Sequence, residues 1–220
     1  MRASAFVFDL DGVIVDTAKY HYLAWKKLAN ELGFEFTKEQ NELFKGVSRK
    51  RCLEILLDIG GITAAQEQFD RWMVEKNEDY LEYIEKMDAS EILPDVPKVV
   101  GFLKDRNIPI ALGSASKNAR PILEKVKLLP SFDAIVDGND VSKAKPDPEV
   151  FLIAAQKLNV APENCVVFED AVAGIQAANN ADMISIGIGD AQILSEADYN
   201  FNDFTEISLA FLESLMSVQA

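Results

Sequence analysis

The chain has 220 residues, a length that predicts one large domain or a core with a modest insertion. Hydrophobic residues make up 49% and charged residues 26%, which is ordinary globular composition and excludes a disordered chain or a fibre. The net charge of −14 disfavours nucleic acid and anionic membrane surfaces as partners, and no apolar run approaches the length of a membrane span.

The few cysteines and histidines limit which cellular compartment and which metal sites are possible. We expect Cys52 and Cys165 to be reduced thiols rather than a bridge, in a monomeric cytoplasmic protein whose N-terminus lacks the long apolar stretch of a secretory signal. His21 is the only histidine, so a zinc site with several histidine ligands is excluded.

Short apolar runs that end in turn-forming residues predict five buried strands, at residues 3–8, 108–112, 134–136, 165–168 and 183–188. Helical spacing of apolar residues predicts helices between them, at residues 96–106, 118–128, 148–158 and 171–178. Strands that alternate with helices predict an α/β fold, with a Rossmann-like parallel sheet covered on both faces.

The alternation is interrupted after the first strand. Residues 17–87 contain no strand-like segment, and helical patterns occupy residues 22–32, 49–59 and 64–87. We therefore predict an all-helical insertion at residues 16–92, and a catalytic core that is formed by residues 1–15 and 93–220.

Two pairs of acids follow predicted strands: Asp9 with Asp11, and Glu169 with Asp170. The carboxyl ends of parallel strands meet at one edge of a sheet, where open α/β folds bind ligands. Two carboxylates about 4 Å apart repel by about 4 kcal/mol at an effective dielectric of about 20. Acids can also end strands simply as turn residues. Two such pairs favour a cation site, and oxygen ligands without a histidine or cysteine cluster favour Mg²⁺.

Asp9 and Asp11 are separated by one residue, and alternate residues of an extended chain point the same way. One of them can therefore act as a nucleophile that forms an acyl-phosphate, while the other donates and accepts a proton. Gly12 allows the sharp turn that follows them.

Two further clusters carry positive or hydrogen-bonding groups. Residues 114–118 (Ser-Ala-Ser-Lys-Asn) combine hydroxyls, an amide and a lysine at a predicted helix start, which favours an anion site over a simple serine cap. Lys145 would be a solvated surface lysine by itself; its interest comes from the acids and the phosphate that it would face.

In this order the chemistry-bearing residues resemble the four motifs of the haloacid dehalogenase superfamily over the whole chain. The residues that carry the resemblance are Asp9-Leu10-Asp11-Gly12, Ser114, Lys145-Pro146 and Glu169-Asp170. Closer details are similar to a sugar-phosphate mutase of this superfamily, and they are Asp16-Thr17-Ala18, His21, Trp25, Lys45-Gly46-Val47-Ser48-Arg49 and Ser116-Lys117-Asn118. The helical insertion then corresponds to the small mobile cap of the superfamily.

The resemblance implies that Asp9 is the nucleophile, that Asp11 is the general acid and base, and that Ser114 and Lys145 neutralise the transferring phosphoryl group. It implies Mg²⁺ held by Asp9, Asp11 and Asp170, with Glu169 in or beside the ligand shell. The implied reaction converts β-glucose 1-phosphate to glucose 6-phosphate through β-glucose 1,6-bisphosphate.

A bisphosphate needs two anion sites, and the second would combine Arg49 with Ser116, Lys117 and Asn118. The full set of expected substrate-side residues is His21, Trp25, Gly46, Val47, Ser48, Arg49, Lys76, Ser116, Lys117 and Asn118. His21 would either position Asp11 or be an ordinary satisfied histidine, and Trp25 would be part of the helical core in either case. Cys52 stands where the resemblance predicts serine, which puts the glucose specificity in doubt.

Two alternatives stay open at this point. A phosphatase of the same superfamily would share the first half-reaction, with water in place of the sugar hydroxyl as the acceptor. A non-enzymatic phosphoacceptor of the receiver type also places acids, a hydroxyl and a lysine at strand ends. The length, the helical insertion and the Asp-x-Asp after the first strand argue against the receiver.

Overall fold

The computed structural model describes residues 3–44 and 47–216. A six-stranded sheet forms the core, and its strand order is β3-β2-β1-β4-β5-β6, with every neighbouring pair parallel. The strands are β1 (Ala5–Phe8), β2 (Ile110–Gly113), β3 (Ala134–Val136), β4 (Cys165–Glu169), β5 (Ile184–Ile188) and β6 (Tyr199–Phe201). The predicted Rossmann-like α/β sheet is confirmed.

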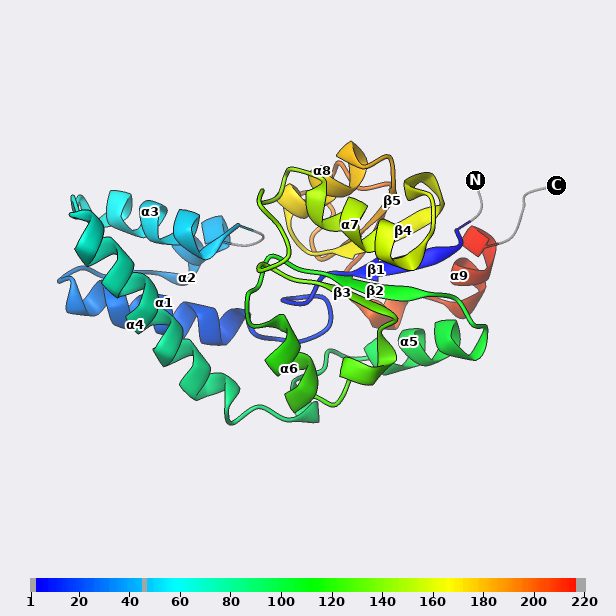
Figure 1. Cartoon of the computed structure of the whole chain (residues 1–220), viewed down its shortest axis with the longest axis horizontal. Helices are drawn as coiled ribbons and strands as arrows, with labels where there is room; N and C mark the ends of the chain where they lie inside the picture. The colour runs from blue at the N-terminus through cyan, green and yellow to red at the C-terminus, as the bar shows by residue number, and fades with distance from the viewer. Residues whose placement is uncertain (1–2, 45–46, 217–220) are drawn as a thin grey trace.

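Helices lie on both faces of the sheet and in a separate lobe (Figure 1). They are α1 (Ala18–Glu31), α2 (Lys38–Asn41), α3 (Arg49–Gly60), α4 (Gln66–Ile84), α5 (Val96–Asp105), α6 (Ala119–Lys125), α7 (Glu149–Leu158), α8 (Val172–Asn180) and α9 (Leu209–Met216). Single 3₁₀ turns occur at η1 (Glu42–Phe44), η2 (Ala89–Glu91), η3 (Leu129–Ser131), η4 (Pro162–Asn164) and η5 (Phe204–Glu206). Helices α7 and α8 cover one face of the sheet, and α5, α6 and α9 cover the other.

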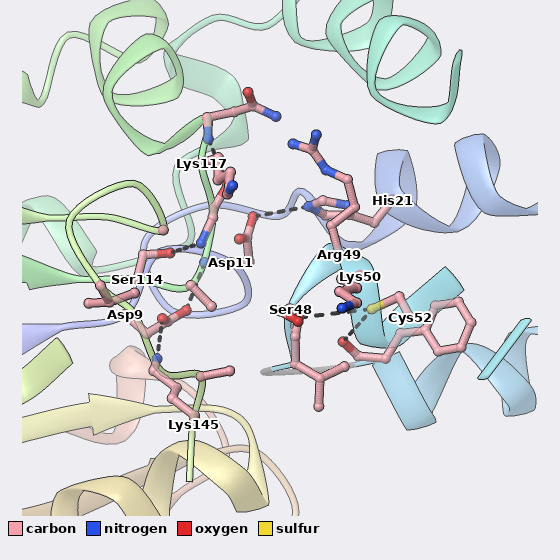
Figure 2. Close-up of a pocket in the computed structure, with 18 of the residues that line it drawn as sticks. Asp9, Asp11, His21, Ser48, Arg49, Lys50, Cys52, Ser114, Lys117 and Lys145 are labelled. Atoms are coloured by element: carbon pink, nitrogen blue, oxygen red, sulfur yellow. Dashed lines mark hydrogen bonds and ion pairs between the residues drawn. The ribbon is translucent and has the colours of Figure 1, made fainter. Parts of the chain in front are cut away.

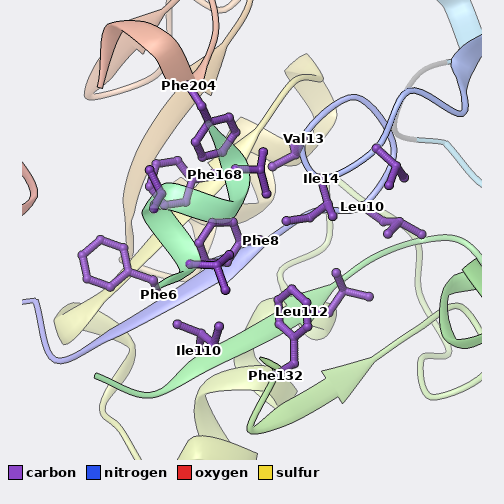
Figure 3. Close-up of a cluster of buried hydrophobic side chains, with 14 of the residues drawn as sticks. Phe6, Phe8, Leu10, Val13, Ile14, Ile110, Leu112, Phe132, Phe168 and Phe204 are labelled. Carbon is purple, nitrogen blue, oxygen red and sulfur yellow. The ribbon is translucent and has the colours of Figure 1, made fainter. Parts of the chain in front are cut away.

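Buried aromatic rings hold the central strand in place. Phe8 stacks on Phe168 of the neighbouring strand with 4.8 Å between ring centroids, and Phe204 lies 5.1 Å from Phe168 (Figure 3). Each of these side chains is fully or almost fully buried, and burial of a phenylalanine contributes about 1.5–3 kcal/mol. The end of β1, where Asp9 follows, is therefore a rigid platform for a site.

Helices α1 to α4 form the separate lobe, and we refer to residues 16–92 as the cap. The cap has its own apolar cluster, in which Trp25, Phe36 and Leu53 are buried. The two chain connections between cap and core run side by side, because Val15 pairs with Ile92 in an antiparallel bridge. A lobe with its own core and a narrow paired connection can change its position relative to the sheet without unfolding.

The sequence patterns missed the last strand and the last helix. β6 has only three residues and its Tyr199 is exposed, so it lacks the apolar run that marked the other strands. The helix that was expected at residues 118–128 is shorter, because α6 spans Ala119–Lys125 and Lys127 adopts a positive φ of 61°. None of the helices within residues 3–44 and 47–216 combines the length and the apolar character needed to cross a membrane.

Candidate active site

A cavity of about 370 Å³ lies between the carboxyl ends of the central strands and the cap. It falls within the size range of small-ligand pockets. Figure 2 shows core residues on one side of the space and residues of α1 and α3 on the other. The predicted site residues that line it are Asp9, Asp11, His21, Trp25, Val47, Ser48, Arg49, Lys76, Ser114, Ser116, Lys117, Asn118, Lys145 and Asp170.

Asp9 lies directly after β1, where its carboxylate is held from two sides. Its Oδ1 accepts a hydrogen bond from Lys145 Nζ at 2.6 Å, and its Oδ2 accepts one from the Asp11 backbone N–H at 3.0 Å. Only 9% of its side chain is exposed, and that exposed part faces the cavity. These contacts orient the carboxylate and reduce its freedom, as a positioned nucleophile requires.

Lys145 is buried behind Asp9 and uses all three of its donors. It donates to Asp9, to Glu169 and to the Gly113 carbonyl at 3.2 Å. Burial by itself would lower the pKa of Lys145, but the Asp9 and Glu169 carboxylates outweigh it and hold the pKa above its usual value. The ammonium therefore stays charged beside the Asp9 carboxylate.

Glu169 does not reach the cavity. Its carboxylate accepts hydrogen bonds from Lys145 and from the Ala171 backbone N–H, at 3.0 Å for the latter. It also packs so closely on Gly174 of α8 that a Cβ at this glycine would lie 1.9 Å from the carboxyl carbon. Glu169 thus holds Lys145 from behind, while Asp9, Asp11 and Asp170 border the cavity.

Asp11 faces the cap rather than Asp9. Its Oδ1 accepts a hydrogen bond from the Thr17 hydroxyl and lies 3.8 Å from His21 Nε2. Burial, followed by the nearby charge of Asp9, raises the pKa of Asp11 to about 6. A carboxyl group with a pKa near neutrality can both give and take a proton, which is the property of a general acid and base.

A chain of polar side chains continues from the half-buried Asp11 into the cap, through His21 to the buried Lys76. His21 Nδ1 lies 2.9 Å from Lys76 Nζ, and its ring stacks on Tyr80 with 4.1 Å between centroids. Burial and the charge of Lys76 hold the pKa of His21 well below its usual value, so the ring is neutral. With Nδ1 accepting from Lys76, the remaining N–H of His21 is on Nε2 and faces Asp11.

Lys76 itself is almost completely buried in α4. Its ammonium lies 4.7 Å from the ring centroids of both Trp25 and Tyr80. Burial, and then the charge of Arg49, lower the pKa of Lys76 to about 7. Burial leaves the Lys76 ammonium with little water around it. An anion in the adjoining cavity would therefore stabilise the charged form of this lysine.

Residues 114–118 form a tight turn after β2. Ser114 Oγ accepts from the Ser116 N–H at 3.1 Å, and Ser116 Oγ accepts from the Asn118 N–H at 3.3 Å. Each hydroxyl keeps its own hydrogen to donate into the cavity. The helix that follows has only seven residues, so an anion here would be bound by side chains and by the turn rather than by a helix dipole.

Arg49 faces this turn from the cap, at the start of α3 (Figure 2). Ser48 caps the helix by accepting from the Arg51 N–H at 3.3 Å. Among residues 3–44 and 47–216, no carboxylate lies within ion-pair distance of Arg49. Its guanidinium is therefore available to an anion. Gly46, also expected in the site, lies outside the described residues.

Cys52 supports the turn that precedes Arg49. Its thiol lies 3.7 Å from the Phe44 carbonyl oxygen and 3.9 Å from the Val47 carbonyl oxygen. Burial raises the pKa of Cys52 to about 12, so the thiol keeps its proton and acts as a weak donor. The side chain also borders the cavity, where serine would offer a stronger hydrogen bond.

The donors around Asp9 fit a magnesium ion. Among the described residues, no three acid, histidine or cysteine side chains form a metal cluster by themselves. Mg²⁺ does not need one, because it is bound through one or two carboxylates together with waters and phosphate oxygens. Asp170 lies against the Asp9–Gly12 turn, where a Cβ at Gly12 would approach its Oδ2 to 2.2 Å. Asp9 and Asp170, which both border the cavity, are thus suitable carboxylate donors.

Three groups of the site carried no expected role in the sequence. Thr17 holds Asp11, the Gly113 carbonyl accepts from Lys145, and Asn77 of α4 accepts from Asn118 Nδ2 at 2.9 Å. A strand-end glycine and a polar residue on a polar helix give no local signal. Asn77 directly follows Lys76, which was expected in the site. This gave no reason to expect Asn77 there as well, because consecutive residues of a helix do not share a face.

Comparison with known proteins adds independent information. Residues 3–182 match the haloacid dehalogenase-like hydrolase family. The chain is 42% identical to the β-phosphoglucomutase of Bacillus subtilis over 212 residues, which is 94% of this chain and 93% of that protein. It is 32% identical over 203 residues to a phosphorylated carbohydrates phosphatase of Thermotoga maritima, covering 88% of this chain and 90% of that protein.

The fold is also similar to that of a solved structure over nearly the whole chain. The crystal structure of β-phosphoglucomutase from Clostridium difficile has a TM-score of 0.93, with 39% identity and 97% of each chain covered.

Proposed function

The chain belongs to the haloacid dehalogenase-like hydrolases, and we propose that it is a β-phosphoglucomutase, an isomerase that interconverts β-glucose 1-phosphate and glucose 6-phosphate. The single observation that carries this proposal is that two separate groups of cationic and hydrogen-bonding side chains border one cavity. Ser114 and Lys145 beside Asp9 form one group, and Arg49 with Lys117 forms the other. A bisphosphate intermediate needs both at once.

The main alternative is a phosphatase, because relatives at 32% identity include one that is named for phosphorylated carbohydrates. Both enzymes would use the same nucleophile and differ only in what removes the phosphoryl group. Arg49 on the cap favours the mutase, since hydrolysis does not require that a second phosphate be bound. A receiver-type phosphoacceptor has no use for the cap or for the cavity beneath it.

The mechanism follows from the contacts of Asp9 and Asp11. An Asp9 carboxylate oxygen forms a bond to phosphorus while the bond from phosphorus to the sugar oxygen breaks. Asp11 gives its proton to the departing sugar oxygen, and in the reverse direction it takes the proton of the attacking hydroxyl. Lys145 and the Ser114 hydroxyl neutralise the equatorial phosphoryl oxygens.

The cap contributes to the choice between a sugar hydroxyl and water. His21, held by Lys76, presents its N–H toward Asp11, and therefore the placement of the acid and base depends on the placement of α1 and α4. Arg49 and Lys117 hold the phosphate that is not reacting, which orients the sugar over Asp9. Mg²⁺ bound by Asp9, Asp170 and the Asp11 carbonyl would neutralise charge on the phosphoryl group.

The direct test is incubation with β-glucose 1-phosphate, Mg²⁺ and a trace of β-glucose 1,6-bisphosphate, with glucose 6-phosphate and inorganic phosphate measured together. A mutase forms glucose 6-phosphate far faster than it releases phosphate. Release of phosphate as the main product would replace the mutase by the phosphatase.

Arg49→Ala should separate the two functions. Loss of a charge-assisted contact to phosphate costs about 1.5–3 kcal/mol, so formation of glucose 6-phosphate at subsaturating substrate should fall by at least about tenfold. Hydrolysis of acetyl phosphate should change little, because this donor has no second phosphate to be held. The measurement is the ratio of the two rates in the variant and in the wild type.

Arg51→Ala is the matched control for Arg49→Ala. Arg51 is on the same helix, is exposed, and pairs with Glu54 at 3.0 Å rather than facing the cavity. We expect the Arg51 variant to keep the wild-type ratio of glucose 6-phosphate to phosphate. If the Arg49 variant keeps that ratio as well, Arg49 does not hold a distal phosphate.

Removal of divalent cations should stop phosphoryl transfer without unfolding the core. Charge neutralisation by a metal ion contributes several kcal/mol, so exhaustive EDTA treatment should lower the rate by at least about 100-fold, and added Mg²⁺ should restore it. The circular dichroism spectrum should not change, because the packing of the central strands is apolar and aromatic. Full activity after such treatment would exclude the proposed ion.

A further inference from the structure

A hydrogen bond between two neutral side chains connects the cap with the phosphate-binding turn of the core. Asn118 Nδ2 donates to Asn77 Oδ1 at 2.9 Å, across 41 positions of the sequence. Asn77 is in the middle of α4, and Asn118 ends the turn that begins at Ser114. In Figure 1, α4 runs from the far end of the cap toward α6, the helix that Asn118 precedes.

The backbone of the turn is already fixed by the core. The Asn118 N–H donates to Ser116 Oγ at 3.3 Å, and Asn139 Nδ2 donates to the Lys117 carbonyl at 3.1 Å. Gly138 lies so close that a Cβ there would approach the Ala115 carbonyl oxygen to 2.3 Å. The hydrogen bond from Asn118 to Asn77 is therefore not needed to shape the turn, and what it restrains is the side-chain amide of Asn118.

The orientation of that amide decides whether it attracts or repels phosphate. The nitrogen of an asparagine side chain has two N–H donors, and its oxygen is an acceptor only. With one N–H donating to Asn77, the second N–H of Asn118 remains for an anion in the cavity that Asn118 borders. A rotated amide would instead present its oxygen to a phosphate oxygen, and two acceptors repel each other.

We propose that Asn77 is a positioning residue for the distal phosphate site, which it serves by holding the Asn118 amide with an N–H toward the cavity. This role rests on the proposed mutase function, because only a substrate with a second phosphate uses that site. It also makes the distal site depend on the position of the cap, since the acceptor is on α4 and the donor is on the core. Asn118 binds the phosphate; Asn77 acts through Asn118.

The test is a double-mutant cycle on the kinetics of the intact enzyme. Asn77→Ala should raise the KM for β-glucose 1-phosphate by about three- to tenfold, the effect of one neutral hydrogen bond, with a smaller change in kcat. Asn118→Ala should raise it by at least as much. The KM of the double variant should exceed that of Asn118→Ala by less than about twofold, because the two side chains act as one unit.

Two further measurements distinguish this role from support of the helix alone. Hydrolysis of acetyl phosphate should be unchanged in Asn77→Ala. The control is Glu78→Ala, at the next position of α4, where the side chain is exposed, and it should retain the wild-type KM. Effects of Asn77→Ala and Asn118→Ala that multiply in the double variant would overturn the inference, as would equal KM values for the Asn77 and Glu78 variants.

Failure of the inference and failure of the proposed function have different outcomes in the same assays. If the wild-type protein releases phosphate and forms no glucose 6-phosphate, the mutase function fails before any variant is compared, and the proposed role of Asn77 fails with it. If the wild type forms glucose 6-phosphate and Asn77→Ala behaves like the control, only the role of Asn77 is wrong.

Discussion

Asp9→Asn should lower sugar-phosphate turnover by at least about 10⁴-fold, because an amide is not a nucleophile toward phosphorus at neutral pH. The substitution preserves the shape of a side chain that is enclosed by Lys145 and by the Asp11 backbone N–H. Lys145 keeps its contacts to Glu169 and to the Gly113 carbonyl, so its ammonium is not left without an anionic partner. The loss should therefore be chemical rather than structural.

The measurement has two readouts. Steady-state formation of glucose 6-phosphate should disappear, and incubation of the Asp9→Asn protein with acetyl phosphate, followed by rapid quenching and mass spectrometry, should show no phosphorylated species. Asp105→Asn, at an exposed acid on α5, is the control and should keep both. Substantial turnover by purified Asp9→Asn would mean that another group accepts the phosphoryl group.

The predictable part of the fold was the part with strong local patterns. The buried central strands consist of apolar residues bounded by turn residues, and β3 was predicted to the residue at 134–136. Strand β6 has three residues, of which none is fully buried, and the sequence contains no signal for it. Its place in the sheet comes from pairing with β5, where Gly187 lies opposite Asn200, and such a tertiary contact is not visible locally.

The site divides in a similar way. Residues at strand ends, such as Asp9 and Ser114, could be placed from sequence because parallel strands bring their ends to one edge. The direction in which each side chain points could not be predicted from the sequence. Glu169 and Asp170 are adjacent, yet the first is turned behind Lys145 and only the second borders the cavity. Neighbours on a strand point to opposite sides, and which side faces the ligand depends on packing against Gly174.

Contacts between cap and core were the least predictable feature. The two partners of such a contact belong to different lobes and can be distant in the sequence, as with Asn118 and Asn77, and the contact depends on how one lobe sits on the other. No periodicity records that arrangement. The resemblance of the motifs supplied Arg49, His21 and Lys76 as candidates, but their mutual contacts were found only in the structure.

The proposed proton-transfer role of Asp11 leads to the second large effect. Asp11→Asn should lower the rate of sugar phosphoryl transfer by roughly 10²–10⁴-fold, the usual contribution of general acid–base catalysis, with a much smaller change in KM. An amide can still accept from Thr17, so the side chain should keep its place beside His21. It cannot give a proton to the leaving sugar oxygen or take one from the attacking hydroxyl.

The leaving group provides the decisive comparison for Asp11→Asn. Acetate is a weak base and departs from acetyl phosphate without receiving a proton. A sugar alkoxide is a strong base and needs a proton in order to depart. Phosphorylation of Asp9 by acetyl phosphate should therefore be affected far less than transfer to or from the sugar. Comparable losses with the two donors would show that Asp11 supports phosphate binding or the position of Asp9. A loss below about tenfold with the sugar phosphate would remove Asp11 from proton transfer altogether.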